Sequence, residues 1–205
     1  MALADLLYRC PRCGFDPMDG EGDDASCPAC STRYSRGRGD RLLVERRPDG
    51  VTAEVPVATL VDLIEANGGP LSRAERPDGS IDYRADVLAS WRVGEEPVHH
   101  RGALRGFSES MGEAVQAVLK VDRDGVTLSA PGQPEARMAF LEIRALQTSS
   151  SSLQLSLPGD RLVQFKFLSD SPRRWEDLLR QLLRAAYRRA GKGNVVEFQP
   201  RIVTE

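Results

Sequence analysis

Four cysteines, all that the chain contains, form two Cys-X-X-Cys pairs near its start. The pairs are Cys10 with Cys13 and Cys27 with Cys30, and thirteen residues separate them. Four thiolates at about 2.3 Å complete the tetrahedral shell that Zn²⁺ prefers, and each Cys-X-X-Cys turn can direct two sulfurs at one ion. The types and spacing of these residues therefore predict one structural metal site with four sulfur ligands.

Other uses of the cysteines are less consistent with the sequence. Two disulfides need an oxidising compartment, and the opening MALADLLYRC lacks the basic region and long apolar run of a secretory signal. A thioredoxin-like redox pair is expected singly, at a helix start after a strand. Iron in a rubredoxin-like site would use the same cysteines, so zinc is favoured and iron stays open.

In its residues CPRCG and CPAC, the segment from about residue 6 to residue 34 resembles the zinc-ribbon family. Pro11 and Pro28 fix φ for tight turns, and Gly14 can adopt the left-handed conformation that turns the chain back. Ribbons of this family bind nucleic acid, dock proteins or act as structural staples, so the resemblance leaves the function open. Because so small a segment has little apolar surface, metal binding is expected to supply its folding free energy.

Composition sets the frame for the remaining residues. The chain has 205 residues, of which 40% are hydrophobic and 28% charged, and its formal net charge is -2. This length allows one sizeable core with a small module, or two small domains. The net charge gives no overall attraction to nucleic acid or anionic membrane. No apolar stretch approaches the roughly 20 residues that span a membrane. A cytoplasmic protein is expected, with peripheral membrane contact as an alternative.

The sequence predicts that residues 36–95 form a linker followed by a ββαββ segment. The basic stretch from Ser31 to Asp40 is interpreted as the link between two units, and the arginines from Arg33 to Arg41 give the alternative of nucleic-acid binding. Two Arg-Pro-Asp-Gly sequences, at 47–50 and 76–79, predict hairpin turns because Pro fixes φ and Gly accepts positive φ. Between them, apolar residues at helical spacing predict a helix over 57–66.

From residue 98 onward, short apolar segments alternate with turn residues. The clearest hairpin runs from Ala114 to Ala130, with alternating apolar residues before an Asp-Arg-Asp-Gly turn. Further strands are expected over 136–140, 143–147, 153–157 and 162–168. One helix follows, with Ser171 as its cap, Pro172 in its first position and an apolar stripe that begins at Trp175.

The KVDRDGVTLSA hairpin and the SPRRWEDLLRQLLRAAYRR helix give residues 96–192 a resemblance to pleckstrin-homology and GRAM-type domains. In that family a C-terminal helix caps a β-sandwich or barrel, and the domains bind phosphoinositides, anionic phospholipid or protein segments. The resemblance therefore implies a binding module. Lipid-binding members use Lys and Arg around the first strand-strand loop, whereas the corresponding residues here, 106–113, are acidic.

The polar face of the last helix is the other candidate for contact with lipid. It carries a run of arginines, namely Arg173, Arg174, Arg180, Arg184, Arg188 and Arg189. A basic amphipathic helix can lie on an anionic membrane. The lipid or anion site expected on this ground is Arg180, Arg184, Arg188 and Arg189, and the competing interpretation is a solvated face.

No catalytic constellation is visible in the sequence. It contains no Gly-X-Ser-X-Gly elbow, no phosphate-binding glycine loop and no His-Glu-X-X-His motif. Four cysteine ligands leave a metal ion no open position for water. His99 and His100 are neighbours on an expected strand, so they would point to opposite faces. Glu95 and Glu96 are expected to be solvated.

Together these patterns predict an α+β, mainly β protein. A four-cysteine zinc ribbon (residues 1–35) precedes the linker and middle segment (36–95), a pleckstrin-homology-like β-sandwich or barrel with its helix (96–192) and an extended tail (193–205). The predicted function is a noncatalytic zinc-binding adaptor with a protein partner. The alternatives are an anionic membrane-surface or lipid-sensing accessory of a lipid-handling enzyme, and a nucleic-acid-binding ribbon. No small-molecule substrate is indicated.

Overall fold

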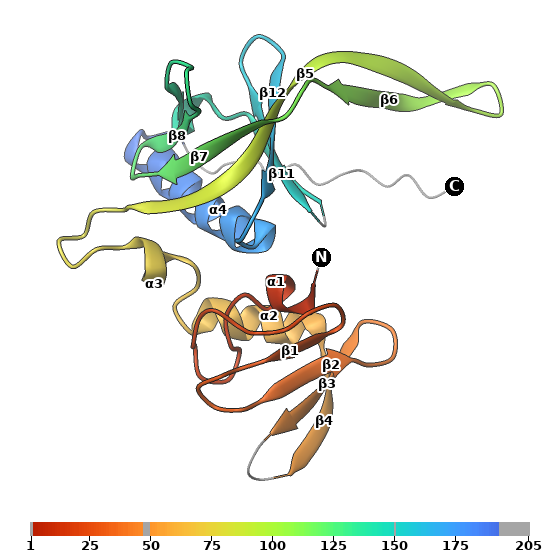
Figure 1. The fold of residues 1–205 in the computed structure, drawn as a ribbon, viewed down its shortest axis with the longest axis vertical. Helices are drawn as coiled ribbons and strands as arrows, with labels where there is room; N and C mark the ends of the chain where they lie inside the picture. The colour runs from red at the N-terminus through yellow and green to blue at the C-terminus, as the bar shows by residue number, and fades with distance from the viewer. Residues whose placement is uncertain (1, 47–49, 150, 193–205) are drawn as a thin grey trace. The chain divides into compact units, whose positions relative to one another are not determined.

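The computed structural model describes residues 2–46, 50–149 and 151–192, which fall into two units (Figure 1). The ribbon unit comprises Met1–Glu75 and Asp170–Leu178, and the sheet unit comprises Arg76–Ser169 and Leu179–Glu205. Each unit contains its own antiparallel sheet. The predicted α+β, mainly β class is confirmed. The expected tail, 193–205, lies outside the described residues.

The sheet of the ribbon unit has four strands in chain order. They are β1 (Asp24–Ser26), β2 (Arg33–Arg36), β3 (Arg41–Arg46) and β4 (Val51–Pro56). Three helices accompany them, α1 (Leu3–Leu6), α2 (Val57–Ala66) and α3 (Leu71–Ala74). Helix α2 has the predicted bounds, and it buries Leu60 and Ile64, which are one turn apart on the predicted apolar stripe.

The basic stretch expected to be a linker is instead part of this sheet. Residues 33–36 form β2, which pairs with β3 so that Tyr34 lies opposite Val44. Tyr34, Leu42 and Val44 are buried, and they belong to the same apolar core as Cys10 and Cys27. The arginines between them gave the stretch a linker-like composition. A four-cysteine ribbon has little apolar surface, and here β3 and α2 enlarge its core.

Both Pro-Asp-Gly sequences were predicted to form hairpin turns, and the structure differs between them. The first connects β3 to β4, with Arg46 opposite Val51, so the predicted hairpin is confirmed, although 47–49 lie outside the described residues. The second is a turn in which the Gly79 N–H donates to the Arg76 carbonyl (2.8 Å) and Gly79 has a φ of 76°. It follows helix α3, and single bridge residues, Glu75 and Ile81, flank it in place of the two strands expected there.

The sheet unit contains an open sheet of eight antiparallel strands. These are β5 (Tyr83–His100), β6 (Ala103–Met111), β7 (Val115–Val121), β8 (Gly125–Ser129), β9 (Ala136–Ala139), β10 (Ala145–Thr148), β11 (Ser152–Leu157) and β12 (Arg161–Phe167). A 3-10 turn, Phe140–Glu142, follows β9. The main path of the sheet is β10-β11-β12-β5-β7-β8-β9, and β6 pairs with β5 beside it. No sheet of the described chain is closed, so the expected barrel is not confirmed.

The strands predicted after residue 114 are largely confirmed. Strands β7 and β8 form the predicted hairpin, with Leu119 opposite Leu128 and both side chains buried. In β7 every second residue from Ala117 to Val121 is buried, as period-2 alternation requires. Strands β9 to β12 lie within a few residues of their predicted positions. These strands could be predicted from the sequence because apolar residues on one face alternate with polar residues on the other.

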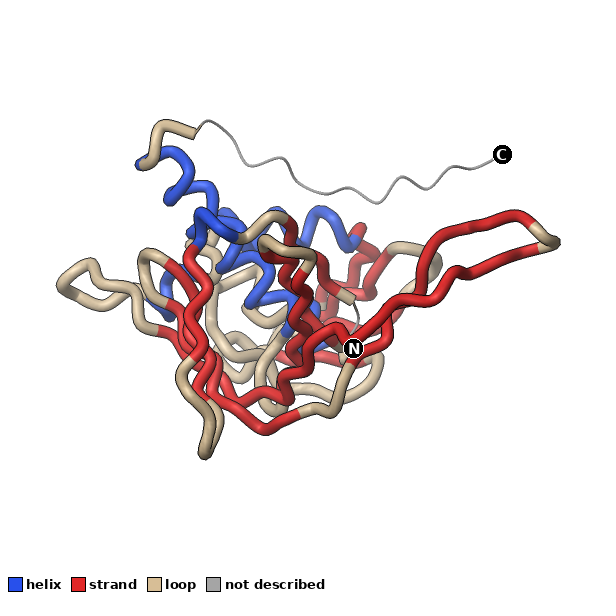
Figure 2. The backbone as a smooth tube through the Cα atoms, turned by 90° about the horizontal axis from the view of Figure 1, so that it is seen from above, coloured by secondary structure: helices blue, strands red, loops and turns tan. Residues whose placement is uncertain are grey.

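The two longest strands were not predicted over their full lengths. Strand β5 has 18 residues; its first part pairs with β7 and β12, and from Arg92 onward it pairs with β6 alone. Residues 92–111, which we call the arm, form a two-stranded ribbon that extends beyond the rest of the sheet (Figure 2). The expected acidic loop at 106–113 is therefore wrong, since 106–111 belong to β6. Both faces of the arm are largely exposed, so no apolar alternation marked it as strand.

Helix α4 (Pro172–Arg189) has its first half in the ribbon unit and its second half in the sheet unit. The predicted cap is confirmed, because the Arg174 N–H donates to Ser171 Oγ at 3.1 Å. Its apolar stripe is buried throughout, at Trp175, Leu178, Leu179, Leu182, Leu183 and Ala186. Within the sheet unit, Tyr187 Oη donates to the Ile143 carbonyl at 3.4 Å. No helix in the described part of the chain is long and apolar enough to cross a membrane.

Candidate metal centre

The structure brings the four predicted ligands together. Their Sγ atoms all lie within 4.8 Å of one another. The Sγ atoms of Cys10 and Cys30 are 3.7 Å apart, and those of Cys13 and Cys27 are 3.5 Å apart. A tetrahedral ion with bonds of about 2.3 Å requires sulfur-sulfur distances of about 3.8 Å. The sulfurs therefore fit a single metal ion such as zinc, and the predicted ligand set is confirmed as a cluster of metal-binding geometry.

Both Cys-X-X-Cys turns have the same backbone design. In the first, the Gly14 N–H donates to the Cys10 carbonyl at 2.9 Å; in the second, the Ser31 N–H donates to the Cys27 carbonyl at 2.8 Å. The residue after each pair has positive φ, 73° at Gly14 and 55° at Ser31. Gly14 was predicted for this role, whereas Ser31 was not, because serine adopts the left-handed region less readily than glycine.

Two buried hydroxyl groups lie next to the sulfurs. Tyr34 Oη is 3.6 Å from Cys10 Sγ, and Thr32 Oγ1 is 3.2 Å from Cys30 Sγ. Tyr34 is 1% exposed and Thr32 fully buried, so neither hydroxyl has ready access to solvent. A hydroxyl in this position can donate to a thiolate and orient it toward a metal ion. Neither contact was predicted from the sequence.

Burial and hydrogen bonding give the thiols of this site different pKa values. Burial raises the pKa of Cys27 to about 12, and it also raises the pKa of Cys10, where backbone N–H groups of Cys13 and Arg12 act in the opposite direction. Burial favours the thiol form of Cys30 too, but hydrogen bonds from Thr32, Cys27 and Cys13 together outweigh it and lower the pKa to about 6. A cation that binds all four sulfurs as thiolates would offset this cost of burying negative charge.

Removing the Tyr34 hydroxyl is expected to weaken metal binding without removing a ligand. Because outer contacts of this kind orient the ligand and stabilise its charge, Tyr34→Phe should lower metal affinity by about 10-fold or more. Thr32→Val should act in the same direction at Cys30. Competition with a chromophoric chelator at fixed pH measures the change. Thr52→Val, at an exposed position of β4 in the same sheet, is the matched control and should leave the affinity unaltered.

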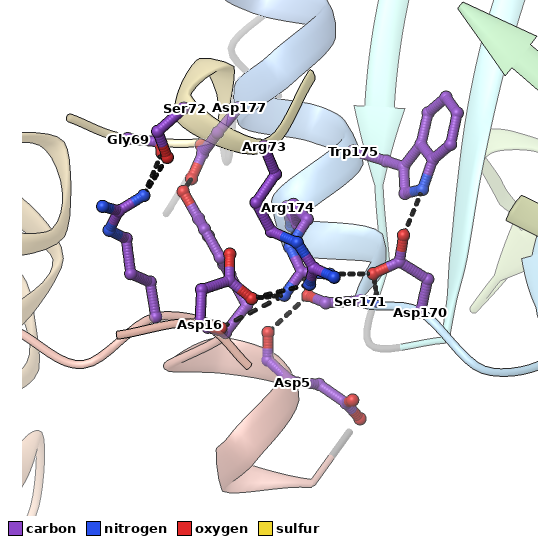
Figure 3. A network of polar contacts seen from close by, with 12 residues as sticks. Asp5, Asp16, Gly69, Ser72, Arg73, Asp170, Ser171, Arg174, Trp175 and Asp177 are labelled. Carbon is purple, nitrogen blue, oxygen red and sulfur yellow. Dashed lines mark hydrogen bonds and ion pairs between the residues drawn. The ribbon is translucent and has the colours of Figure 1, made fainter. Parts of the chain in front are cut away.

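A buried ionic network lies within the ribbon unit, between the cysteine segment and the first turns of α4 (Figure 3). Arg174 is 5% exposed and ion-pairs with Asp16 at 2.5 Å and with Asp170. Its guanidinium also donates to the Tyr8 carbonyl at 3.1 Å and lies 5.2 Å from the centre of the Tyr8 ring. Arg73 makes a second ion pair with Asp16 at 2.9 Å.

Further polar contacts join the same two segments. Tyr8 Oη donates to Asp177 Oδ2 at 3.1 Å, and the Ser171 hydroxyl donates to the Asp5 carbonyl. Trp175 Nε1 donates to Asp170 Oδ2 at 2.8 Å, which fixes the other end of the carboxylate that binds Arg174. Burial raises the pKa of Asp16, while the guanidinium groups of Arg174 and Arg73 oppose that rise. The network thus ties the start of α4 to the segment that carries the first cysteine pair.

The arginines predicted for the helix surface do not form one face. Arg174 is buried and Arg173 is half-buried beside Asp177, at 2.9 Å, so neither belongs to a solvated surface. Arg184 and Arg188 are exposed and Arg180 is half-buried. Arg189 is exposed, but it donates to the Arg123 carbonyl at 2.9 Å and ion-pairs with Asp124 at 3.3 Å. The prediction that all of these arginines lie on the polar face is therefore wrong for Arg173 and Arg174.

Other residues singled out in the sequence lie at separate places. His99 and His100 are exposed at the end of β5, in the arm. Glu95 and Glu96 are exposed there as well. The arginines between 33 and 41 are exposed on β2, β3 and the turn between them, and Arg36 ion-pairs with Asp23 at 3.4 Å. In the described ranges, the four cysteines are the one group of three or more His, Cys, Asp or Glu side chains with metal-binding geometry.

Comparison with known proteins assigns no family to the chain. No protein-family model matches the sequence, and no curated protein matches it. A solved structure, the C-terminal domain of an unknown protein from Leishmania infantum, is similar over 55% of this chain and 95% of its own, with 14% identity and a TM-score of 0.32. A similarity at that level carries no argument about fold or function.

Proposed function

We propose that this chain is a noncatalytic, zinc-binding interaction protein whose metal stabilises the ribbon unit. The observation that carries the proposal is the set of four sulfurs within 4.8 Å of one another. Four such ligands would complete the tetrahedral shell of a zinc ion and leave it no position for water or substrate. Cys10 and Cys27 lie in the apolar core of the unit, as expected for ligands of a structural site. Soft, all-thiolate ligation favours zinc among the common divalent ions, with iron as the alternative.

Cobalt substitution tests whether the site is closed. Co²⁺ adopts the tetrahedral geometry of zinc in such sites, and its visible absorption reports on the ligands. We expect a spectrum of tetrahedral thiolate coordination that does not change when azide is added, because no position is open. Cys13→Ser, which replaces the exposed ligand, should make the spectrum azide-sensitive and is the positive control. An azide-sensitive spectrum of the unaltered protein would contradict a structural site, and elemental analysis of the purified protein decides between zinc and iron.

For the sheet unit, we propose a binding module of the pleckstrin-homology type. The main path of the sheet contains seven antiparallel strands, and one amphipathic helix follows them, which is the element order of that family. The first connection of this path, from β5 to β7, contains β6 and hence the arm. Lipid-binding members carry an excess of basic residues in that connection. In the arm, three arginines are balanced by three glutamates, Glu95, Glu96 and Glu109, so a protein partner is favoured over a lipid headgroup.

A membrane-surface role is the second candidate, and the exposed side chains of Arg184 and Arg188 favour it. It predicts salt-sensitive co-sedimentation with anionic vesicles, lost in the Arg180→Glu, Arg184→Glu, Arg188→Glu triple variant. The adaptor proposal predicts no such binding at low salt. Nucleic-acid binding through Arg33 to Arg41 would instead give affinity that falls steeply with salt. Either result would replace the adaptor proposal, provided that the variant retains the far-ultraviolet circular dichroism of the parent.

A further inference from the structure

The arm carries opposite charges at its two ends. Near its base, where β5 leaves the main sheet, lie three glutamates, Glu95, Glu96 and Glu109. Near its tip, where β5 turns into β6, lie Arg101 and Arg105 with the two histidines of the chain. All of these residues are exposed, and they lie on β5, on β6 or in the turn between the two strands. The arm is therefore a dipolar ribbon, acidic at the base and basic at the tip.

The base has more carboxylates than cations. Glu95 lies directly opposite Glu109 in the β5–β6 register, an arrangement that destabilises a strand pair. One guanidinium, that of Arg92, is shared by both of them, at 3.4 Å and 4.0 Å, and also by Asp160 at 2.6 Å. Glu96 adds a further negative charge. The base thus retains a negative potential that one arginine does not neutralise.

The tip has the opposite imbalance, with more cations than carboxylates. In the described part of the chain, no carboxylate lies within ion-pair distance of Arg101 or Arg105. At about 3.3 Å per residue, six residues of β5 place Glu95 on the order of 20 Å from Arg101. This separation exceeds the screening length of about 8 Å at physiological salt. Arg105 lies closer to the base, between the register positions of Val98 and His99, so Arg101 at the outermost tip is the cation that the glutamates of its own arm cannot neutralise.

The arm also exposes apolar side chains and an open strand edge. Val93 is 73% exposed, Leu104 54% and Val98 45%. Strand β6 has β5 as its one strand neighbour in the described sheet, so its outer backbone groups remain open to a further strand. The outer edge of β5 is protected by Pro97, which has no N–H to donate. A partner would therefore approach along β6.

We propose that the arms of two copies of this chain pack antiparallel about a two-fold axis, with the basic tip of each on the acidic base of the other. Two-fold symmetry makes every favourable contact occur twice, and it closes the assembly at a dimer. Each Glu95–Glu109 pair receives the cations that it lacks, and each tip receives carboxylates. The same contact covers the open β6 edges and the exposed apolar side chains. The proposal concerns the sheet unit and does not depend on the metal site.

Sedimentation equilibrium of the full, metal-loaded chain at low and moderate salt tests the proposal. The unaltered protein is expected to be a dimer that weakens as salt is added. Arg101→Glu with Arg105→Glu makes the whole arm acidic, and Glu95→Arg with Glu109→Arg makes it basic. Each pair of changes should raise the dissociation constant at least about tenfold. All four changes in one chain exchange the two charged ends, so this variant should dimerise again.

A control variant and two further results show how the dimer could be contradicted. Lys166→Glu with Arg144→Glu reverses two exposed charges outside the arm and should leave dimerisation unchanged. If this control weakens the dimer as much as the arm variants do, the effect is one of net charge and the proposal fails. It also fails if the four-change variant stays monomeric while it retains the unfolding midpoint of the parent. A monomer that instead binds phosphatidylserine vesicles through Arg101 and Arg105 would assign the arm to a membrane surface.

Discussion

Replacing Cys27 with Ser is expected to abolish tight metal binding and to unfold the ribbon unit. Cys27 is 1% exposed, so the variant loses a ligand in the core and leaves a poorly placed hydroxyl there. Structural zinc sites in small domains contribute on the order of 10 kcal/mol to folding, which exceeds what a core of this size supplies by itself. Hydrogen exchange of the β2 and β3 backbone amides should change from protected to nearly unprotected.

Chelation of the metal from the unaltered protein provides an independent route to the same state. Its exchange pattern should match that of the Cys27→Ser variant, and readdition of zinc should restore protection only in the unaltered chain. Strands β7 and β8 of the sheet unit serve as the internal reference for the measurement. Retention of β2 and β3 protection after complete chelation would show that the apolar core holds the fold without the ion.

Replacing Arg174 with Met is expected to cost about 3 to 5 kcal/mol of stability, because it leaves buried carboxylates without their cation. Asp16 and Asp170, whose side chains are 4% and 8% exposed, both pair with this guanidinium. Arg73 still neutralises part of the Asp16 charge, which places the expected loss near the lower end. Urea unfolding in a Trp91→Phe background, where Trp175 is the remaining tryptophan, measures the effect.

Arg188→Met is the matched control, since Arg188 lies on the same helix and is exposed, and the change should alter stability by no more than about 0.5 kcal/mol. Adding Asp16→Asn to Arg174→Met should recover part of the loss, because it removes one of the uncompensated charges. Equal stability of the Arg174→Met and Arg188→Met variants would mean that the ionic network makes no net contribution.

Local sequence patterns correctly predicted the parts of this molecule whose structure depends on a few neighbouring residues. Two cysteines three residues apart occupy one tight turn, so each pair of candidate ligands can be recognised without tertiary information. Helix α2 and the β7–β8 hairpin are similarly marked, because apolar residues at period 3.6 or 2 place one face in a core. The predictions failed where this contrast is missing, as in the arm, whose two faces are both exposed to water.

The sequence by itself determined the four candidate metal ligands, the mainly β class and the apolar face of α4. Tertiary structure decided which charges are buried. Asp16 lies in a spacer with other aspartates, and Arg174 lies in a helix with other arginines, so nothing local distinguishes either residue. They meet across 158 residues of chain. A charge leaves water only when the fold supplies its counter-charge and hydrogen bonds, and that pairing depends on where distant segments come together.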